Sequence, residues 1–358
     1  MSDPDWLLAQ AHPHRGALNN LPNRFAKHHS EREDDGWQLL VADSHPHTQV
    51  QQERVKTILS HNDSPDLPFH TTLNPYRGCE HGCIYCFARP SHAYWDLSPG
   101  LDFETRLIAK SNAVEVLKNT LQDPKYQVEP LALGANTDAY QPLESRLQTT
   151  RQLLEVLLDY RHPVGLVTKG ALILRDLSLW QALAAQELAS VRISLTTLDE
   201  DLRQRLEPRA ATVSARLKVI ERLSQAGVPV GVMLAPVIPA LNEHELEQLL
   251  AAAANAGAKW AGYILLRLPL EVAPLFRDWL QQHYPQRAQH VMSLVQQSRD
   301  GKDYDARFGQ RMRGQGKFAE LLAQRFRLAC KRYGLNEQAA PPLRTDLFQP
   351  PNQQFSLF

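Results

Sequence analysis

The sequence predicts an α/β fold whose parallel sheet closes into a barrel-like shape. From residue 70 onward, apolar runs of about five residues alternate with helical stretches of roughly 11–18 residues, which is typical of parallel βα units. Six such units are visible, and no Gly-x-Gly-x-x-Gly word follows the first expected strand. The absence of this glycine-rich motif argues against a dinucleotide-binding sheet and favours a barrel.

The expected elements alternate along the chain. Short apolar runs predict strands at residues 70–73, 130–134, 164–168, 191–195, 228–234 and 260–266. Apolar positions at helical spacing predict helices at residues 104–121, 145–160, 177–188, 212–226 and 243–255. Beyond residue 270 the pattern becomes helical and basic.

These patterns divide the chain into four parts. We expect an N-terminal extension at 1–50, a barrel at 51–295, a helical basic segment at 296–340 and a flexible tail at 341–358. The extension shows no persistent period, so it is expected to be flexible or loosely docked. Its two His-Pro-His words leave a second metal site open as an alternative.

Composition excludes several classes of protein. Lys and Arg total 39, as do Asp and Glu, so the net charge of zero points to no particular partner. No apolar run approaches the ~20 residues of a membrane span, and the polar N-terminus shows no signal peptide. Three of the four cysteines are clustered, which indicates a reducing compartment. We therefore expect a cytoplasmic protein.

Three cysteines stand in one loop with the spacing C-x3-C-x2-C, and they are Cys79, Cys83 and Cys86. An iron–sulfur cube is usually held by four thiolates, so three thiolates leave one iron open to substrate or cofactor. Gly78 and Gly82 suit the tight bends of such a loop. A zinc site completed by His81 or His92 is the alternative.

The cysteine spacing resembles that of the radical SAM superfamily. Tyr85, directly before the third cysteine, matches the position that packs against adenine in that family. Further words resemble the branch related to spore photoproduct lyase, a radical enzyme that reverses a DNA photolesion. They are NTDAYQPLE at 136–144, SLTTLD at 194–199, LEPR at 206–209 and APVIP at 235–239. The resemblance covers roughly residues 50–335.

This resemblance implies a partial (β/α)6 TIM-like barrel, a 4Fe-4S cluster and S-adenosylmethionine (SAM). In that family the reduced cluster passes one electron to SAM, and the resulting 5′-deoxyadenosyl radical abstracts a hydrogen atom from the substrate. The resemblance makes the three cysteines the metal ligands and the catalytic residues. It also implies a reductant such as flavodoxin or ferredoxin.

The candidate cofactor contacts lie where expected strands end, because the C-terminal ends of barrel strands carry the active site. By resemblance they are Tyr85, Asn136, Thr137, Asp138, Ser194, Thr196, Ala235 and Val237. Asn136 and Asp138 suit the ammonium group of the cofactor, and Ser194 and Thr196 suit its ribose or carboxylate. Lys169 follows another expected strand.

One departure argues against the photolesion reaction itself. Spore photoproduct lyase uses a further cysteine inside the barrel as a hydrogen donor, whereas no cysteine lies between Cys86 and Cys330 here. Cys330 stands in a helical context and is expected to be a packed apolar residue. Tyr94, Tyr140 and Tyr263 are alternative donors. A different DNA- or nucleotide-linked step, in repair or modification, is favoured over that lyase reaction.

Residues 299–335 contain ten Lys and Arg against four Asp and Glu, so their net charge is +6. Such a segment is either a solvated helix face or a DNA-contacting surface, with Arg307, Arg311, Arg313 and Lys317 as candidate contacts. If DNA is not the partner, the same chemistry acts on a small molecule, a peptide or RNA. A third class is a non-enzymatic iron–sulfur or zinc binding protein.

The last five residues, Gln-Phe-Ser-Leu-Phe, resemble the peptide by which bacterial repair and replication proteins bind the DNA polymerase sliding clamp. Leu357 and Phe358 would fill an apolar pocket, while Gln354 supplies hydrogen bonds. Phe355 departs from the common form, which has leucine at this position.

Overall fold

The computed structural model describes residues 14–25 and 47–351. The expected clamp-binding residues Gln354, Leu357 and Phe358 lie outside these ranges, as does most of each His-Pro-His word. Within the described ranges, no helix has the length and apolar character needed to cross a bilayer.

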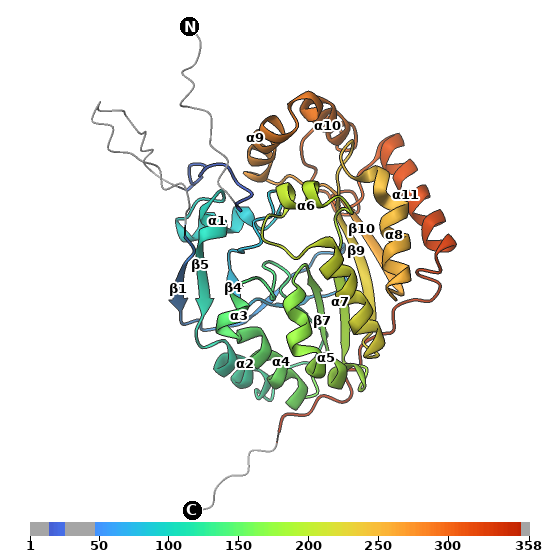
Figure 1. Ribbon diagram of the computed structural model, residues 1–358. Helices are drawn as coiled ribbons and strands as arrows, with labels where there is room; N and C mark the ends of the chain where they lie inside the picture. Colours follow the sequence, from blue (N-terminus) through green and yellow to red (C-terminus); the bar gives the residue numbers. More distant parts are fainter. Residues whose placement is uncertain (1–13, 26–46, 352–358) are drawn as a thin grey trace, which may run out of the picture.

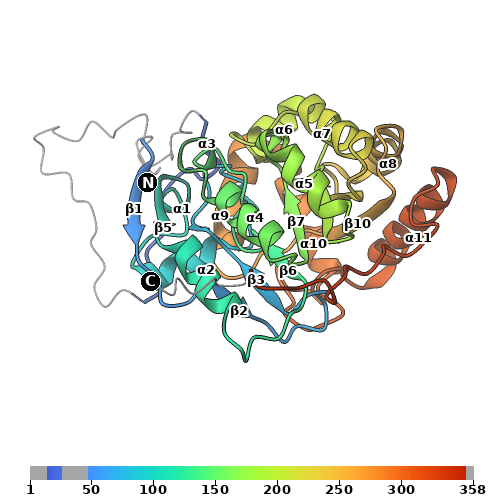
Figure 2. The ribbon, with the colours of Figure 1, turned by 90° about the horizontal axis from the view of Figure 1, so that it is seen from below.

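One curved sheet of seven strands forms the centre of the molecule, in the order β10-β9-β8-β7-β6-β3-β2 (Figures 1 and 2). Its strands are β2 (Leu59–His61), β3 (Thr71–Leu73), β6 (Leu131–Leu133), β7 (Val164–Thr168), β8 (Ala189–Ser194), β9 (Val230–Val237) and β10 (Trp260–Leu265). β3 and β6 to β10 are parallel, and β2 pairs antiparallel with β3. The predicted α/β fold with six parallel strands is confirmed, and this open sheet is consistent with a partial TIM-like barrel.

Helices cover the outer face of the sheet. They are α2 (Ala113–Leu121), α4 (Thr149–Asp159), α5 (Leu177–Ala184), α7 (Val213–Gln225), α8 (Leu246–Asn255) and α11 (Gly316–Arg332). Their apolar sides pack with strand residues such as Leu133, Leu166, Val191 and Val232 in one hydrophobic core. α6 (Glu200–Leu206), α9 (Val272–His283) and α10 (Pro285–Gln297) lie instead at the upper side of the molecule (Figure 1).

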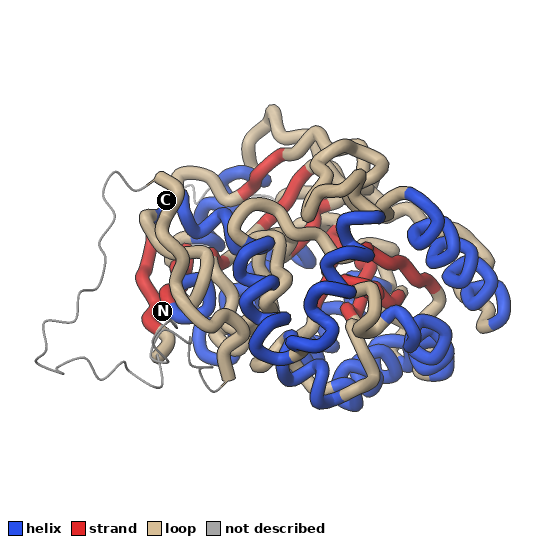
Figure 3. The backbone as a smooth tube through the Cα atoms, turned by 90° about the horizontal axis from the view of Figure 1, so that it is seen from above, coloured by secondary structure: helices blue, strands red, loops and turns tan. Residues whose placement is uncertain are grey.

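The opposite, inner face of the sheet is accessible to solvent. Successive strand residues point to opposite faces. In β7, Val164, Leu166 and Thr168 are buried whereas Val167 is 43% exposed. β3 and β6 alternate in the same way, as does most of β8. In the part of the chain that the structure describes, loops rather than a second layer of helices lie over this side in the view from above (Figure 3).

Residues 104–121 do not form the single helix that their apolar spacing predicts, and that prediction was wrong. The observed elements are α1 (Asp102–Thr105), β5 (Arg106–Lys110) and α2. β5 lies in a separate three-stranded sheet between β1 (Gln49–Glu53) and β4 (Tyr76–Arg77). Leu107, Ile108 and Ala109 are all buried, and such a continuous apolar run does not distinguish a strand from a helix.

Smaller differences concern element boundaries. The boundary expected after residue 50 falls inside β1. The helix expected at 145–160 is divided into α3 (Glu144–Leu147) and α4 at Gln148, whose φ is 53°. A left-handed residue of this kind ends a helix because its backbone cannot continue the helical path.

The basic segment expected at 296–340 is helical only in part. Residues 298–315 form an irregular loop between α10 and α11. Its glycines with left-handed backbone are Gly301, Gly309 and Gly314, which explains why no helix forms here. The backbone N–H of Leu265 donates to the carbonyl of Met312 at 2.9 Å, so the loop packs against the end of β10.

Candidate active site

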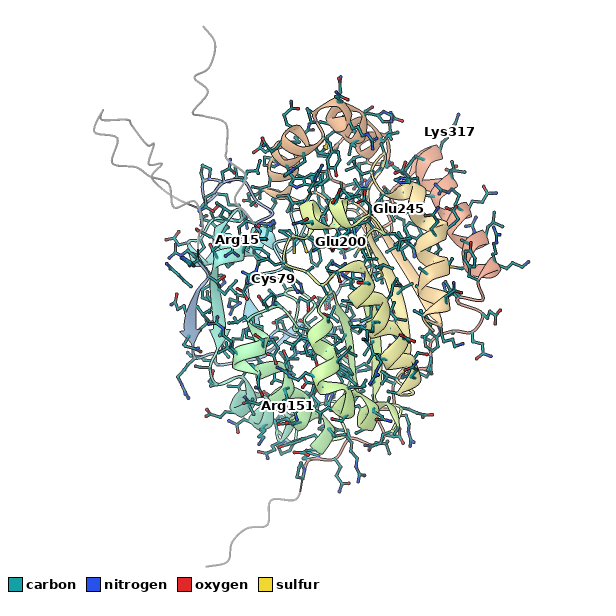
Figure 4. All side chains as sticks on the ribbon, in the orientation of Figure 1. Arg15, Cys79, Arg151, Glu200, Glu245 and Lys317 are labelled. Carbon is teal, nitrogen blue, oxygen red and sulfur yellow. The ribbon has the colours of Figure 1, made fainter. Side chains whose placement is uncertain are left out.

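The cysteine loop lies near the upper end of the sheet, between β4 and the 3-10 helix η2 (Arg89–Trp95) (Figure 4). Cys79 and Cys83 are 7% and 8% exposed, Cys86 is half-buried, and all three thiols are free. Gly78 and Gly82 have φ values of 74° and 69°, which are left-handed conformations that glycine adopts without strain. They allow the loop to turn tightly on either side of its first cysteine.

Burial raises the pKa of each thiol in this loop. For Cys79 the negative charges of Asp138 and of the other two cysteines raise the pKa further. The pKa of Cys83 rises to about 12, although the ammonium of Lys169 opposes the rise. Three thiolates in this enclosed space therefore need strong positive charge beside them, and bound metal supplies such charge.

This set of donors fits an iron–sulfur cluster better than a single ion. Thiolates are soft ligands that hold such clusters. The histidines of the zinc alternative have other partners, since His81 Nδ1 lies 3.3 Å from Asp138 and His92 Nε2 lies 2.9 Å from the carbonyl of Arg106.

A buried ion pair between Arg89 and Glu104 holds the cysteine loop from behind. The Arg89 guanidinium also donates to the carbonyls of Gly82 and Cys83, at 3.3 and 2.9 Å. Glu104 in turn accepts from the backbone N–H groups of Gly16 and Ala17, at 3.0 and 2.9 Å. The described part of the N-terminal extension is thus fixed directly against the cysteine loop.

Tyr85 belongs to a second buried network at the ends of β8 and β9. Its hydroxyl donates to Glu207, and the hydroxyl of Thr196 lies 3.4 Å from it. Glu207 also forms an ion pair with Arg216, and both side chains are buried. Burial alone would raise the pKa of Glu207, but Arg216 and Lys169 outweigh it and lower the pKa to about 2. The carboxylate is therefore charged at neutral pH.

Lys169 follows β7 and extends into the space between these groups. Its Nζ lies 5.7 Å from the centre of the Tyr85 ring. Burial opposes its charge, but the negative charges of Cys83 and Glu207 raise the pKa of Lys169. In the part of the chain that the structure describes, its ammonium group makes no hydrogen bond. It is thus a charged donor beside the cysteine loop that is still free to bind an anionic group.

Asp138 is already fully engaged by protein groups. Its carboxylate accepts from the Thr168 hydroxyl at 2.6 Å and from the backbone N–H groups of Lys169 and Tyr140, at 2.8 and 2.9 Å. Burial opposes its charge, but the charge and hydrogen bond of His81 lower its pKa. These contacts fix the cysteine loop to the ends of β6 and β7, so Asp138 has little capacity left for the cofactor contact predicted for it.

The other predicted contacts divide into two groups. Ser194 donates to the carbonyl of Ala235 at 3.4 Å, and the Thr196 hydroxyl, which donates to Glu207, lies 3.4 Å from the same carbonyl. Buried Val237 accepts from the backbone N–H of Leu266. By contrast, Thr137 is buried and donates to Tyr76, while Asn136 bonds Asn74 and Ser91. The structure brings Ser194, Thr196 and Ala235 together with Tyr85.

None of the candidate hydrogen donors lies on the inner face of the sheet. Cys330 is buried in α11, as expected of a packed residue. Tyr263 of β10 packs against Phe326 of α11, with ring centres 4.8 Å apart, so it faces outward. Tyr140 bonds Asp176 in the outer core, and Tyr94 is 71% exposed. The tyrosine donors considered from the sequence receive no support from these positions.

The four candidate DNA contacts do not form one free basic surface. Arg307 pairs with Asp305 at 2.6 Å, and Arg311 pairs with Asp66 at 2.6 Å. The guanidinium of Arg313 stacks 4.2 Å above the Tyr263 ring. Lys317 starts α11 and projects outward (Figure 4). Arg307 and Arg311 are therefore already paired with carboxylates, and Arg313 packs on an aromatic ring.

A different basic surface lies on the outer side of the cysteine loop. It is a groove of about 820 Å³ whose lining includes Arg15, Arg146, Arg203 and Arg209. Glu80 of the cysteine loop is the acidic residue in this lining, and it pairs with Arg209 at 3.0 Å. The sequence does not reveal the groove, because these arginines come from three separate segments, around residue 15, residue 146 and residues 203–209.

Several residues around the site were not identified from the sequence as functional. Glu207 belongs to the LEPR motif at 206–209, so the sequence did contain a signal for this residue. No sequence motif pointed to Arg216 or Arg89, because each arginine contacts its carboxylate partner only in the folded chain. Gln141 donates to Gly78 and accepts from Glu80, and it too stood in a quoted word.

Comparison with known proteins agrees with this geometry. Residues 73–253 match the radical SAM superfamily. An uncharacterized protein of Mycobacterium tuberculosis is 39% identical over 230 residues, which are 64% of this chain and 68% of that protein. An uncharacterized protein of Methanocaldococcus jannaschii is 24% identical over 214 residues, 60% of this chain and 76% of that one.

Among solved structures, spore photoproduct lyase complexed with dinucleoside spore photoproduct gives a TM-score of 0.57 at 15% identity, covering 80% of both chains. A mutant of that enzyme with bound AdoMet and the same dinucleoside gives 0.56 at 16% identity, with the same coverage. This likeness concerns the fold. The sequence match over half of the chain shows that the protein belongs to the radical SAM superfamily, whose cofactors are a 4Fe-4S cluster and SAM.

Proposed function

We propose that this protein binds a 4Fe-4S cluster through Cys79, Cys83 and Cys86 and uses it with SAM in a DNA- or nucleotide-linked repair or modification step. The observation that supports this most is the placement of three free, mostly buried thiols beside the free ammonium of Lys169. When bound, the cluster and SAM supply a 5′-deoxyadenosyl radical. A reductant such as flavodoxin or ferredoxin completes the system.

The residues of this chain bind the cofactors and orient them. Lys169 binds the carboxylate of SAM, because its charge lies beside the open side of the cysteine loop. Tyr85 packs against the adenine, held in place by Glu207 and Thr196. The buried ion pair of Arg89 and Glu104 keeps the loop fixed behind the cluster. Together these contacts orient the cofactor and exclude water from it.

A DNA or nucleotide substrate is supported by two observations. The fold is similar to that of a lyase solved with a dinucleoside photoproduct. The arginine-lined groove beside the cysteine loop suits phosphate groups, since Arg binds them bidentately. Lys317 is a further candidate for contact with DNA. Sliding-clamp binding by Gln354, Leu357 and Phe358 stays a prediction from the sequence.

The test is SAM cleavage by the reconstituted, reduced protein under anaerobic conditions. Wild-type protein is expected to form 5′-deoxyadenosine, and Cys83→Ala is expected to reduce its formation to background because one iron loses its ligand. Cys330→Ala is the matched control, since Cys330 packs in α11 away from the loop. A wild-type protein that binds iron but never forms 5′-deoxyadenosine would refute the proposal.

Replacing Lys169 with methionine is expected to weaken SAM binding by about tenfold to a hundredfold, because a hydrogen bond to a charged group contributes ~1.5–3 kcal/mol. Titration calorimetry of the reconstituted protein with SAM measures this. Lys118→Met on the exposed side of α2 is the control and should bind as wild type does. If Lys169→Met binds SAM within twofold of wild type, the assigned role is wrong.

A further inference from the structure

The inner face of the sheet carries one charged side chain, Arg192. The six parallel strands, all of which the structure describes, contain no other Asp, Glu, Lys or Arg. Arg192 alternates in β8 with Val191 and Ile193, which are buried under the outer helices. Its side chain therefore points to the opposite side, into the open concavity of the barrel.

Arg192 has no partner within the described ranges. No hydrogen bond, ion pair or aromatic contact of its guanidinium is present there, whereas most other buried or half-buried arginines pair with a carboxylate or bind carbonyls. Burial lowers the pKa of Arg192, and no neighbouring charge contributes to the shift. A guanidinium stays charged in proteins, and partly buried charges are normally compensated. Within the described ranges no protein group compensates the charge of Arg192, and this points to a ligand.

The surroundings of Arg192 leave room for such a ligand. In the register of the sheet it lies between Val167 of β7 and Gly231 of β9. Val167 is 43% exposed and marks the open side, whereas a Cβ on Gly231 would lie 3.2 Å from the Cβ of Trp260. Ser190 lies two residues below Arg192 on the same face and offers a hydroxyl. Arg192 and Ser190 are thus the polar side chains beside the exposed Val167.

The same strand connects this site with the cofactor end. Ser194 and Thr196 follow Arg192 on the same side and approach Ala235 and Tyr85. At about 3.3 Å per residue, Thr196 is roughly 13 Å from Arg192 along the chain. A substrate placed between them presents one end to the cofactor and the other to Arg192.

We propose that Arg192 is a specificity-determining residue that binds a phosphate group of the substrate inside the barrel. The Arg192 guanidinium supplies a bidentate contact, and Ser190 supplies a further hydrogen bond. This inference rests on the proposed function, because it takes the concavity as the substrate site. It narrows the substrate class to phosphate-bearing molecules, such as a nucleotide or a short piece of nucleic acid.

The test is equilibrium binding to the reconstituted holoenzyme, measured by calorimetry with inorganic phosphate, thymidine 5′-monophosphate and thymidine. Phosphate and the monophosphate are expected to bind, and the monophosphate to bind at least tenfold more tightly than thymidine. Arg192→Gln should lose at least tenfold in affinity for both anions, while Arg192→Lys should retain part of it. Arg222→Gln, on the exposed side of α7, is the control and should bind as wild type does.

Two results would overturn the inference. One is equal affinity of wild type and Arg192→Gln for the two anions, in variants whose circular dichroism and iron content match wild type. The other is absence of binding of both anions to wild type at millimolar concentration. Formation of 5′-deoxyadenosine by wild type is measured in parallel. Its absence together with Arg192-dependent anion binding would refute the proposed chemistry and leave the phosphate site standing.

Discussion

Glu207→Gln is expected to destabilise the protein by about 3–5 kcal/mol, because it leaves the buried charge of Arg216 without its partner. The amide keeps the size of the carboxylate but removes its charge. It also weakens the hydrogen bonds from Tyr85 and Thr196, so the effect should reach the cofactor end of β8. Urea denaturation of the metal-free protein, followed by far-UV circular dichroism at pH 7, measures the loss.

A matched control lies on α2. Glu115 pairs with Arg54 at 3.4 Å and both side chains are exposed, so Glu115→Gln should change the stability by less than about 1 kcal/mol. Both are Glu–Arg ion pairs, so the two variants differ mainly in how deeply the ion pair is buried. Equal denaturation midpoints for the two variants would show that the network around Glu207 does not stabilise the fold.

The dependence of this effect on pH has a definite sign. The pKa of Glu207 is about 2 in the folded protein and 4.5 for an unperturbed glutamate. Its contribution to stability is therefore present above about pH 4.5 and is lost as the pH falls toward 2. The difference in unfolding free energy between wild type and Glu207→Gln should shrink by about 1 kcal/mol between pH 7 and pH 4. A difference that grows on acidification would contradict this assignment.

Local patterns predicted much of the sheet. β7 has the expected bounds, Val164–Thr168, because a short apolar run between turn residues admits few other structures. Thr212 caps α7, at the residue where that helix was expected to begin. The cysteine loop could also be predicted, since its three cysteines and two glycines lie within nine residues, 78–86. In these cases the information is contained in one short stretch.

Long-range pairing was not predictable in the same way. β5 became a strand because β1 and β4 provide partners on both sides, and its own apolar run fits a helix equally well. Similarly, the excess of basic residues after residue 298 suggested a free surface, whereas Arg311 reaches back to Asp66. Arg192 was visible in principle, because Ser190, Arg192 and Ser194 alternate with Val191 and Ile193 as on a half-open strand.

Glu104→Gln is expected to loosen the cysteine loop and to reduce iron incorporation on reconstitution. Glu104 neutralises Arg89, and that arginine donates to the carbonyls of Gly82, Cys83, Pro99 and Gly100. Removing the charge leaves a buried guanidinium uncompensated, which typically costs about 3–5 kcal/mol. Iron content per chain and the thermal unfolding midpoint of the reconstituted protein are the measurements.

Gly16→Ala tests how the N-terminal segment packs against the cysteine loop, and it does so without removing a charge. A Cβ on Gly16 would lie 1.8 Å from the carbonyl oxygen of Gly82, so the N-terminal segment must move away from the loop. We expect faster exchange of the backbone amides of residues 16 and 17 in both variants, because each variant weakens the hydrogen bonds of these amides to residue 104. Glu115→Gln is the control, since Glu115 forms only an exposed pair with Arg54. If exchange and iron content stay at wild-type levels in both variants, the segment does not support the cluster loop. Unchanged iron content with faster exchange would limit its role to covering the loop.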